Sequence, residues 1–283
     1  MSAIASTPIP STSSSPAASP AVRRPRLLET PMQTVRDTWL IFRRSLGLTI
    51  RQPVWVIFGL TNPVLYLLLF GPLLNGATSA VAPGQNAFNW FLPGLLIQIA
   101  MFGTAFGGFG LIGELRYGVV ERMRVTPMSR TAALLGRSLR DVVILEFQAA
   151  TMILLAIPFG VHLDPLGVVG TLGLLALIGL MVAPFSYALG LALKSEDALA
   201  PLLNFLILPL LLLSGILLPM ALAPDWLQTL SSFNPLTHAV DAARAMFNGQ
   251  WGSPEIALGI AVTAIGAVLA LSLASRSFGR ATA

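Results

Sequence analysis

Few side chains in this sequence could do covalent or redox chemistry. The 283 residues include no cysteine, two histidines and a single lysine, Lys194. A phosphate-binding loop requires Gly-Lys-Ser/Thr after a glycine-rich turn, but Lys194 follows Leu193. The zinc-hydrolase pattern His-Glu-x-x-His and the Gly-x-Ser-x-Gly elbow of serine hydrolases do not occur in the sequence either. We therefore expect no catalytic residue, no metal site and no cofactor bound by this chain.

The composition excludes an ordinary soluble protein. Hydrophobic residues make up 55% of the chain and charged residues 10%, whereas a soluble domain has roughly 25% charged residues. So much apolar surface needs a lipid bilayer as its solvent. The net charge of +5 would suit a nucleic-acid partner, but the basic residues gather at the ends of apolar stretches. We therefore expect the charge to set the membrane topology and expect no nucleic-acid partner.

The elements that must carry any functional residue are helices. Six apolar stretches are each long enough to cross about 30 Å of hydrocarbon as a helix, and they lack the alternation of barrel strands. The sequence predicts an all-α membrane protein with six transmembrane helices. We place these helices near residues 54–74, 91–112, 139–159, 166–193, 198–220 and 256–275.

The basic residues predict the orientation of these helices. Seven precede the first span, six lie in the loop after the second, one in the fourth loop and two at the C-terminus. The remaining one, Arg244, lies in the fifth loop. Because basic residues favour the cytoplasmic side, we expect a multi-pass protein of the plasma (inner) membrane with both termini in the cytoplasm.

The N-terminal region divides into a tail and an amphipathic helix. Residues 1–29 are rich in Ser, Pro and Ala and predict a disordered cytoplasmic tail. Residues 30–50 predict a helix that lies along the membrane surface, because an apolar stripe is flanked by basic residues. The stripe consists of Met32, Val35, Trp39, Phe42 and Leu46. Residues 30–283 form a single transmembrane domain in this interpretation.

The densest run of charge lies between the second and third spans. Leu115, Val119 and Met123 can form the apolar side of a short helix that Pro127 ends, with charges of both signs on the other side. One interpretation is a solvated connector that follows the positive-inside rule. The other is a helix at residues 114–130 that docks on a cytoplasmic partner. The length of the segment and its apolar face favour docking.

The fifth loop, residues 221–255, is too long and too apolar for a plain connector. Asp225 and Trp226 open one short helix, and Asn234-Pro235 predicts a cap and first position for a second helix that reaches Phe247. Neither is long enough to span a bilayer, so we expect interfacial or re-entrant helices. Within the second helix, Asp241 and Arg244 are spaced to form an ion pair.

These two segments resemble a known family. The stretch ELRYGVVERMRVTPMSR at residues 114–130, and NPLTH at 234–238 followed by Asp241 and Arg244, are similar to the ABC-2-type exporter permeases, in particular the daunorubicin-resistance-like membrane subunits. The resemblance implies that the first segment is a coupling helix seated in a groove of a separate ATPase subunit, which binds ATP and Mg²⁺. It also implies that the N-terminal helix contacts this ATPase, and that the segment at 221–255 is re-entrant near the external mouth. The coupling residues implied are Glu114, Arg116, Gly118, Glu121, Arg122, Met123, Arg124, Pro127 and Arg130.

The same resemblance implies a translocation path. In the family the second and fifth spans line a path between two membrane subunits. The second span carries a small stripe beside an aromatic one, and Asn204 is the one buried amide of the fifth. The residues expected at the path or dimer interface are Phe102, Gly103, Phe106, Gly107, Phe109, Asn204 and Leu208.

The resulting hypothesis is a permease subunit that moves a hydrophobic or amphiphilic drug or lipid outward. Its expected partners are a separate ABC ATPase, a second copy or homologue of this permease, and the bilayer. One alternative is a polysaccharide or glycolipid exporter of the same superfamily. Another is an ion-coupled carrier, but such carriers use ionisable residues at mid-membrane. We expect none there, since Glu146 is placed two turns into the third span, where Gln148 or a neighbouring helix can pair with it.

Overall fold

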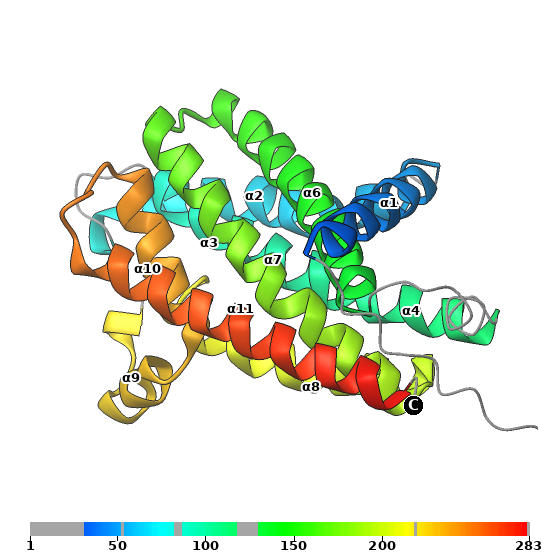
Figure 1. Ribbon diagram of the computed structural model, residues 1–283. Helices are drawn as coiled ribbons and strands as arrows, with labels where there is room; N and C mark the ends of the chain where they lie inside the picture. The colour runs from blue at the N-terminus through cyan, green and yellow to red at the C-terminus, as the bar shows by residue number, and fades with distance from the viewer. Residues whose placement is uncertain (1–30, 52–53, 82–86, 118–129, 218–219, 282–283) are drawn as a thin grey trace, which may run out of the picture.

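The computed structural model describes residues 31–51, 54–81, 87–117, 130–217 and 220–281, and these parts are helical without strands (Figure 1). The helices are α1 (Pro31–Ile50), α2 (Val54–Val81), α3 (Ala87–Ala105), α4 (Gly107–Arg116), α6 (Arg130–Ala156), α7 (Pro165–Leu193), α8 (Glu196–Leu213), α9 (Asp225–Ser232), α10 (Pro235–Phe247) and α11 (Pro254–Ala281). Two short 3-10 turns, Ile157–Phe159 and Met220–Leu222, follow α6 and precede α9.

Five helical stretches in these parts are long and apolar enough to cross a membrane. They are Phe88–Arg116, Thr131–Phe159, Pro165–Leu193, Glu196–Leu213 and Pro254–Phe278. The first expected span falls on α2, whose apolar stretch among the described side chains is the shorter Gly59–Phe70. The all-helical membrane class is therefore confirmed, and the count of six spans stays a prediction.

The third span begins nine residues earlier than expected. We predicted a start near residue 139 because Arg137 and Arg140 suggested a loop, but α6 starts at Arg130. Both arginines lie inside the helix and bind acidic or hydroxyl groups of other helices. A charged side chain that finds a partner no longer has to leave the protein interior, so the helix continues through these positions.

The second span is interrupted where α3 meets α4. The Ser186 hydroxyl of α7 accepts a hydrogen bond from the Gly108 N–H (3.1 Å) and donates one to the Ala105 carbonyl. A side chain inserted into the ladder of backbone hydrogen bonds breaks a helix locally. The break at Phe106 is therefore caused by a residue of another helix. The fifth span is also shorter than expected, because α8 ends at Leu213.

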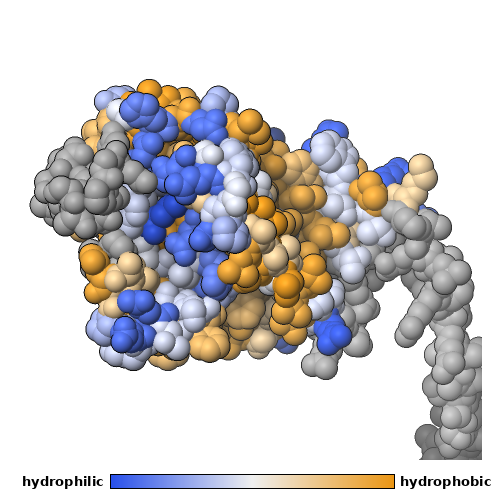
Figure 2. All heavy atoms as spheres, turned by 90° about the vertical axis from the view of Figure 1, so that its left-hand side faces the viewer, coloured by the Kyte–Doolittle hydropathy of each residue, from blue (hydrophilic) through white to orange (hydrophobic). Residues whose placement is uncertain are grey.

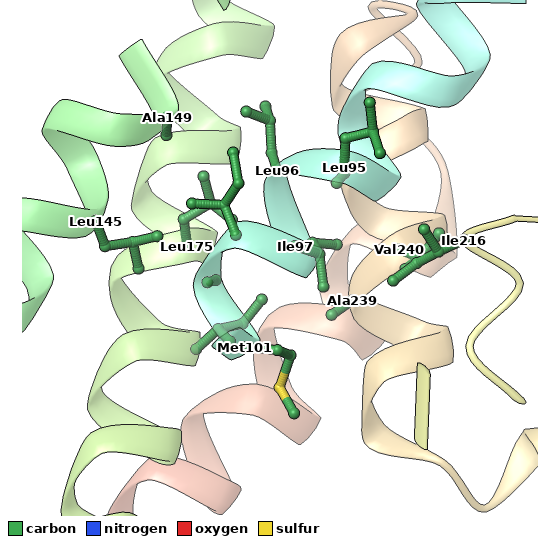
Figure 3. Packing of buried hydrophobic residues seen from close by; sticks show 14 of the residues in the cluster. Leu95, Leu96, Ile97, Met101, Leu145, Ala149, Leu175, Ile216, Ala239 and Val240 are labelled. Carbon is green, nitrogen blue, oxygen red and sulfur yellow. The ribbon is translucent and has the colours of Figure 1, made fainter. Parts of the chain in front are cut away.

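The core is built around α3. Leu95, Leu96 and Ile97 are fully buried, between α6 and α7 on one side and α10 on the other (Figure 3). Helix α11 packs along α7 and against α10 (Figure 1). In contrast, α8 is the least buried of the candidate spans, with 17% of its apolar window buried. The second span is thus central and the fifth peripheral within one chain.

Helix α1 packs on α6 through a face that the sequence pattern did not single out. Ile41 is buried there, and a Cβ on Gly136 of α6 would lie 2.8 Å from the Thr38 carbonyl oxygen, so only glycine allows this approach. The predicted apolar stripe lies beside this face, with Met32, Val35 and Trp39 exposed and Phe42 and Leu46 half-buried. An exposed stripe suits a helix on a membrane surface, which stays a prediction for α1.

Candidate functional site

The predicted coupling residues lie at a gap in the described part of the chain. Glu114 and Arg116 end α4, and Arg130 begins α6. The other expected residues of the segment lie outside the described residues. These are Gly118, Glu121, Arg122, Met123, Arg124 and Pro127. The structure therefore describes the ends of α4 and α6 that flank the segment.

These two ends are joined by an ion pair. The Arg137 guanidinium of α6 donates to the Glu114 carboxylate of α4, and only 4% of the Arg137 side chain is exposed. A charge at this depth is stabilised only when it is paired and hydrogen-bonded. The pair therefore ties the last turn before residues 118–129 to the second turn of the helix that follows them.

A second cluster continues from this pair into the bundle. Arg140 lies 2.8 Å from the Asp141 carboxylate and donates to the Tyr187 hydroxyl of α7 (3.1 Å). Tyr187 donates to Asp141 in turn, and Arg140 also reaches the Thr49 hydroxyl of α1 (3.3 Å). Buried polar groups that satisfy one another couple the helices that carry them. We call Glu114, Arg137, Arg140, Asp141 and Tyr187 the arginine network, which links α1, α4, α6 and α7.

Gly107 packs closely against the arginine network, and a more exposed ion pair lies farther out. A Cβ on Gly107 would lie 3.1 Å from a carboxylate oxygen of Asp141 and 3.2 Å from the Tyr187 hydroxyl. A larger residue at 107 would therefore displace the network. Farther out, Arg116 lies 3.4 Å from Glu196 of α8, with both side chains partly exposed to solvent.

A hollow of about 190 Å³ opens between α1 and the ends of α4 and α6. It contains Arg44 of α1 beside the Glu114–Arg137 pair. The full lining is Leu40, Ile41, Arg44, Ser45, Leu48, Glu114 and Arg137. The hollow combines apolar walls with charges of both signs.

The aromatic residues expected at the path form a row across the α3–α4 break. The rings of Phe102 and Phe106 are stacked with centroids 6.4 Å apart, and Phe106 and Phe109 are 5.5 Å apart. Phe106 is exposed, whereas Phe102 and Phe109 pack against the core. Gly103 lies against Gln148 of α6, where a Cβ would meet its side-chain oxygen at 3.1 Å. Both Gly103 and Gly107 thus allow close packing within the chain.

Asn204 and Leu208 lie on an exposed face of α8. The helix packs through Leu199, Leu203 and Ile207, which recur every four residues and are buried. Asn204 points away from this stripe, and its amide donates to the Ala200 carbonyl (3.1 Å). The expectation of a buried amide is wrong for the single chain, because Asn204 lies outside the packing face of α8, which is formed by the buried stripe and the half-buried Leu206 and Leu210.

At the opposite end of the bundle, Asn234 and Pro235 start α10 as predicted. The Asn234 side chain accepts from the Leu236 N–H (3.0 Å) and donates to the Leu210 carbonyl (2.7 Å). Asn89 of α3 is held similarly, since it accepts from the His162 N–H (2.9 Å) and donates to the His162 carbonyl (3.2 Å). Figure 2 looks onto this end, where hydrophilic residues gather between hydrophobic flanks.

At this end of the bundle, Arg244 of α10 connects several segments of the chain. Its guanidinium donates to the backbone carbonyls of Trp90 (3.2 Å) and Gly215 (2.8 Å) and stacks 3.8 Å from the Trp90 ring centroid. The expected pair with Asp241 is present at 3.9 Å. Burial lowers the pKa of Arg244 to about 10, with Asp241 acting in the opposite direction, so Arg244 stays charged at neutral pH. We call Arg244, Trp90 and Gly215 the arginine anchor.

Comparison with known proteins identifies the family. The family model described as "ABC-2 type transporter" matches residues 36–248, from within α1 to the end of α10. The chain belongs to the ABC-2 type transporter family. This ABC-2 permease is 29% identical over 214 residues to the "Daunorubicin resistance ABC transporter permease protein DrrB1" of Streptomyces coeruleorubidus, with 75% of each chain covered.

Two further relatives extend the comparison. The "Putative transport permease ycf38" of Cyanophora paradoxa is 28% identical over 217 residues, which cover 76% of this permease and 75% of the relative. The "Probable doxorubicin resistance ABC transporter permease protein DrrC" of Mycobacterium tuberculosis (strain ATCC 25618 / H37Rv) is 22% identical over 245 residues, covering 85% and 87%. The predicted family is confirmed, and the chain is a multi-pass membrane permease.

Sequence reasoning singled out Glu114 as a site residue but missed the other four members of the arginine network in this permease. Arg137 and Arg140 were assigned to a loop, and Asp141 and Tyr187 were not singled out. One signal was present: Arg140 and Asp141 stand directly before an apolar run, and a charge pair at such a boundary indicates a helix that begins earlier. Tyr187 gave no such signal, because a tyrosine in an apolar span is equally typical of packing.

Proposed function

We propose that this permease is the membrane-spanning subunit of an ATP-driven exporter that moves a hydrophobic or amphiphilic molecule, a drug or a lipid, out of the cytoplasm or the inner leaflet. The family supports a permease of an ABC transporter. The names of two relatives refer to daunorubicin and doxorubicin resistance, which supports an amphiphilic substrate. ATP and Mg²⁺ would be bound by a separate ATPase subunit, and this chain would supply the path.

The observation that carries the proposal is the arginine network. Residues 118–129 connect α4 to α6, and the Glu114–Arg137 pair joins these helices directly beside the segment. A push on the segment would therefore move α4 and α6 together. Arg140, Asp141 and Tyr187 would carry that movement to α7. A plain connector between two spans would need no such cross-links.

In this mechanism two permease subunits, identical or homologous, face one another. The exposed face of α8 with Asn204 and Leu208, and the exposed ring of Phe106, are proposed to line the path or the subunit interface. ATP binding would close a pair of ATPase subunits and draw the two coupling segments together. The helix α1 would lie on the cytoplasmic membrane surface beside the ATPase, with both termini in the cytoplasm. The segment at 221–255 would form re-entrant helices at the external mouth.

The experiment co-expresses the permease with a candidate partner ABC ATPase and replaces Glu121, Arg122 and Arg124 by alanine. We expect co-purification of the ATPase to be lost, together with its stimulation by the permease. The matched control is Arg276→Ala, which removes an exposed basic residue near the C-terminus and should leave both unchanged. Survival of association and stimulation in the triple variant would show that the segment does not dock on the ATPase.

A further inference from the structure

Glu146 lies near the middle of a candidate membrane span. It is close to the centre of Thr131–Phe159, because α6 begins at Arg130. The packing of α7 against α6 gives Glu146 a similar position. Gly179 is the middle residue of Pro165–Leu193, and a Cβ there would lie 3.0 Å from Val142 and 3.2 Å from Leu145. The sequence placed Glu146 two turns into the third span, and the earlier start of α6 places it near the centre of this helix.

The Glu146 carboxylate has no protein partner among the described residues. Its Oε1 atom is buried and accepts no hydrogen bond there. The expected partner Gln148 instead donates to the Val56 carbonyl of α2 (3.0 Å). By contrast, Glu114 and Asp141 of the arginine network each face an arginine. Glu146 is therefore the acidic side chain that the helix packing leaves unsatisfied at mid-depth.

An unpartnered carboxylate is energetically unfavourable in hydrocarbon. An ionised carboxylate that loses water without gaining a cation or a donor costs several kcal/mol or more. Ionisable residues at this depth are therefore rare and usually serve a ligand or a transport step. A cation brought in by a ligand would remove the cost, because it would supply the missing charge.

The surroundings of Glu146 fit the apolar body of such a ligand. The packing face of α6, with Leu145 and Ala149, is buried. Helical periodicity places Glu146 at the edge of the other face, where Val143 and Phe147 are exposed by 42% and 63%. Phe147 offers an aromatic face, which attracts organic cations when it is desolvated. A carboxylate thus borders an apolar and aromatic surface that no part of the described chain covers.

We propose that Glu146, Val143 and Phe147 form a binding site for amphiphilic organic cations that approach from the lipid. The carboxylate pairs with the cationic centre, and the two apolar side chains contact the body of the molecule. The proposal that these residues bind cations does not depend on the export function. The consequence that the site selects cations among transported amphiphiles rests on the proposed export function.

The test uses the full-length permease in lipid nanodiscs and two probes of the same shape and opposite charge. Tetraphenylphosphonium is a permanent cation and tetraphenylborate is an anion. We expect Glu146→Gln to weaken tetraphenylphosphonium binding by about tenfold or more, equivalent to about 1.4 kcal/mol, and to leave tetraphenylborate binding unchanged. Glu146→Asp should retain part of the cation affinity. The control Asp225→Asn, which neutralises an exposed acid in α9, should change neither.

The outcomes separate the site from the export function. A folded Glu146→Gln protein that binds the cation as tightly as the wild type overturns the proposal. Equal weakening of both probes by Glu146→Gln overturns it as well, because charge selection is then absent. The melting temperature of each variant checks its fold, and Phe147→Ala provides a second variant that should weaken both probes, because its ring contacts the body that they share. If the wild type shows this selective binding but no ATP-driven movement of the cation with its ATPase, the export function fails and the site stands.

Discussion

The two ends of the helix bundle hold their buried arginines in different ways. Beside residues 118–129, Arg137 and Arg140 bind the side chains of Glu114, Asp141 and Tyr187. At the other end, Arg244 binds two backbone carbonyls and an aromatic ring. Its nearest carboxylate, that of Asp241, is 3.9 Å away. Both ends bury positive charge, but one neutralises it with acids and the other with dipoles.

This difference indicates which end can rearrange. Side chains can change rotamer and exchange partners, so a network of side chains has alternative arrangements. Backbone carbonyls move only with their chain segments, so an arginine that binds two of them fixes those segments relative to each other. If residues 114–130 couple to an ATPase as proposed, movement would enter the permease at the arginine network, and the arginine anchor would stabilise a fixed end.

The largest expected effect comes from removing the anchor. Arg244→Ala leaves two carbonyls without their donor and should lower the free energy of unfolding by about 3 kcal/mol. Arg244→Lys keeps the charge but cannot reproduce the guanidinium fork, so about half of the loss should remain. Chemical denaturation in mixed micelles measures both. A loss below about 1 kcal/mol for alanine would show that the carbonyls are not the main partners.

A charge exchange tests the network. Glu114→Arg and Arg137→Glu should each lower the free energy of unfolding by about 2 kcal/mol, and the double variant should recover at least half of the combined loss. Recovery is expected because the partners are side chains of opposite charge. The same exchange at Asp241 and Arg244 should recover nothing, since carbonyls accept hydrogen bonds only. Equal recovery at both ends would remove the distinction between them.

The smallest effect is expected at the exposed pair beside the network. Arg116 and Glu196 have side-chain exposures of 57% and 39%, so solvent screens their attraction. Arg116→Ala should lower the free energy of unfolding by less than about 0.5 kcal/mol, and added salt should abolish the difference. The same denaturation series measures it. An effect as large as that of Arg137 would mean that burial does not govern the strength of these pairs.

The sequence predicted those parts of the fold that local signals specify. The start of α10 followed from Asn234-Pro235, and the apolar run at residues 166–193 predicted α7, which spans Pro165–Leu193. The break at Phe106 could not be predicted, because Ser186, which causes it, stands 78 residues from Gly108 in the chain. Local patterns carry no information about such a distant insertion.

The candidate site was predictable to a smaller extent. The spacing of Asp241 and Arg244 predicted their pair, but nothing near Arg244 in sequence indicated the carbonyls of Trp90 and Gly215, 154 and 29 residues away. Likewise, the link between Tyr187 and Asp141 joins residues 46 apart. Contacts of this kind arise from helix packing, so only the assembled bundle reveals them. Whether residues 114–130 couple to an ATPase stays a prediction.

The long separation between α1 and its packing partner has a consequence for synthesis. Thr49 of α1 and Arg140 of α6 are 91 residues apart, so the inner face of α1 has no partner until the ribosome has made that much more chain. Meanwhile, the exposed stripe with Val35 and Trp39 gives α1 a surface that can adsorb to lipid by itself. If α1 lies on the membrane surface as predicted, it can stay adsorbed to lipid until α6 has been synthesised and packs against it.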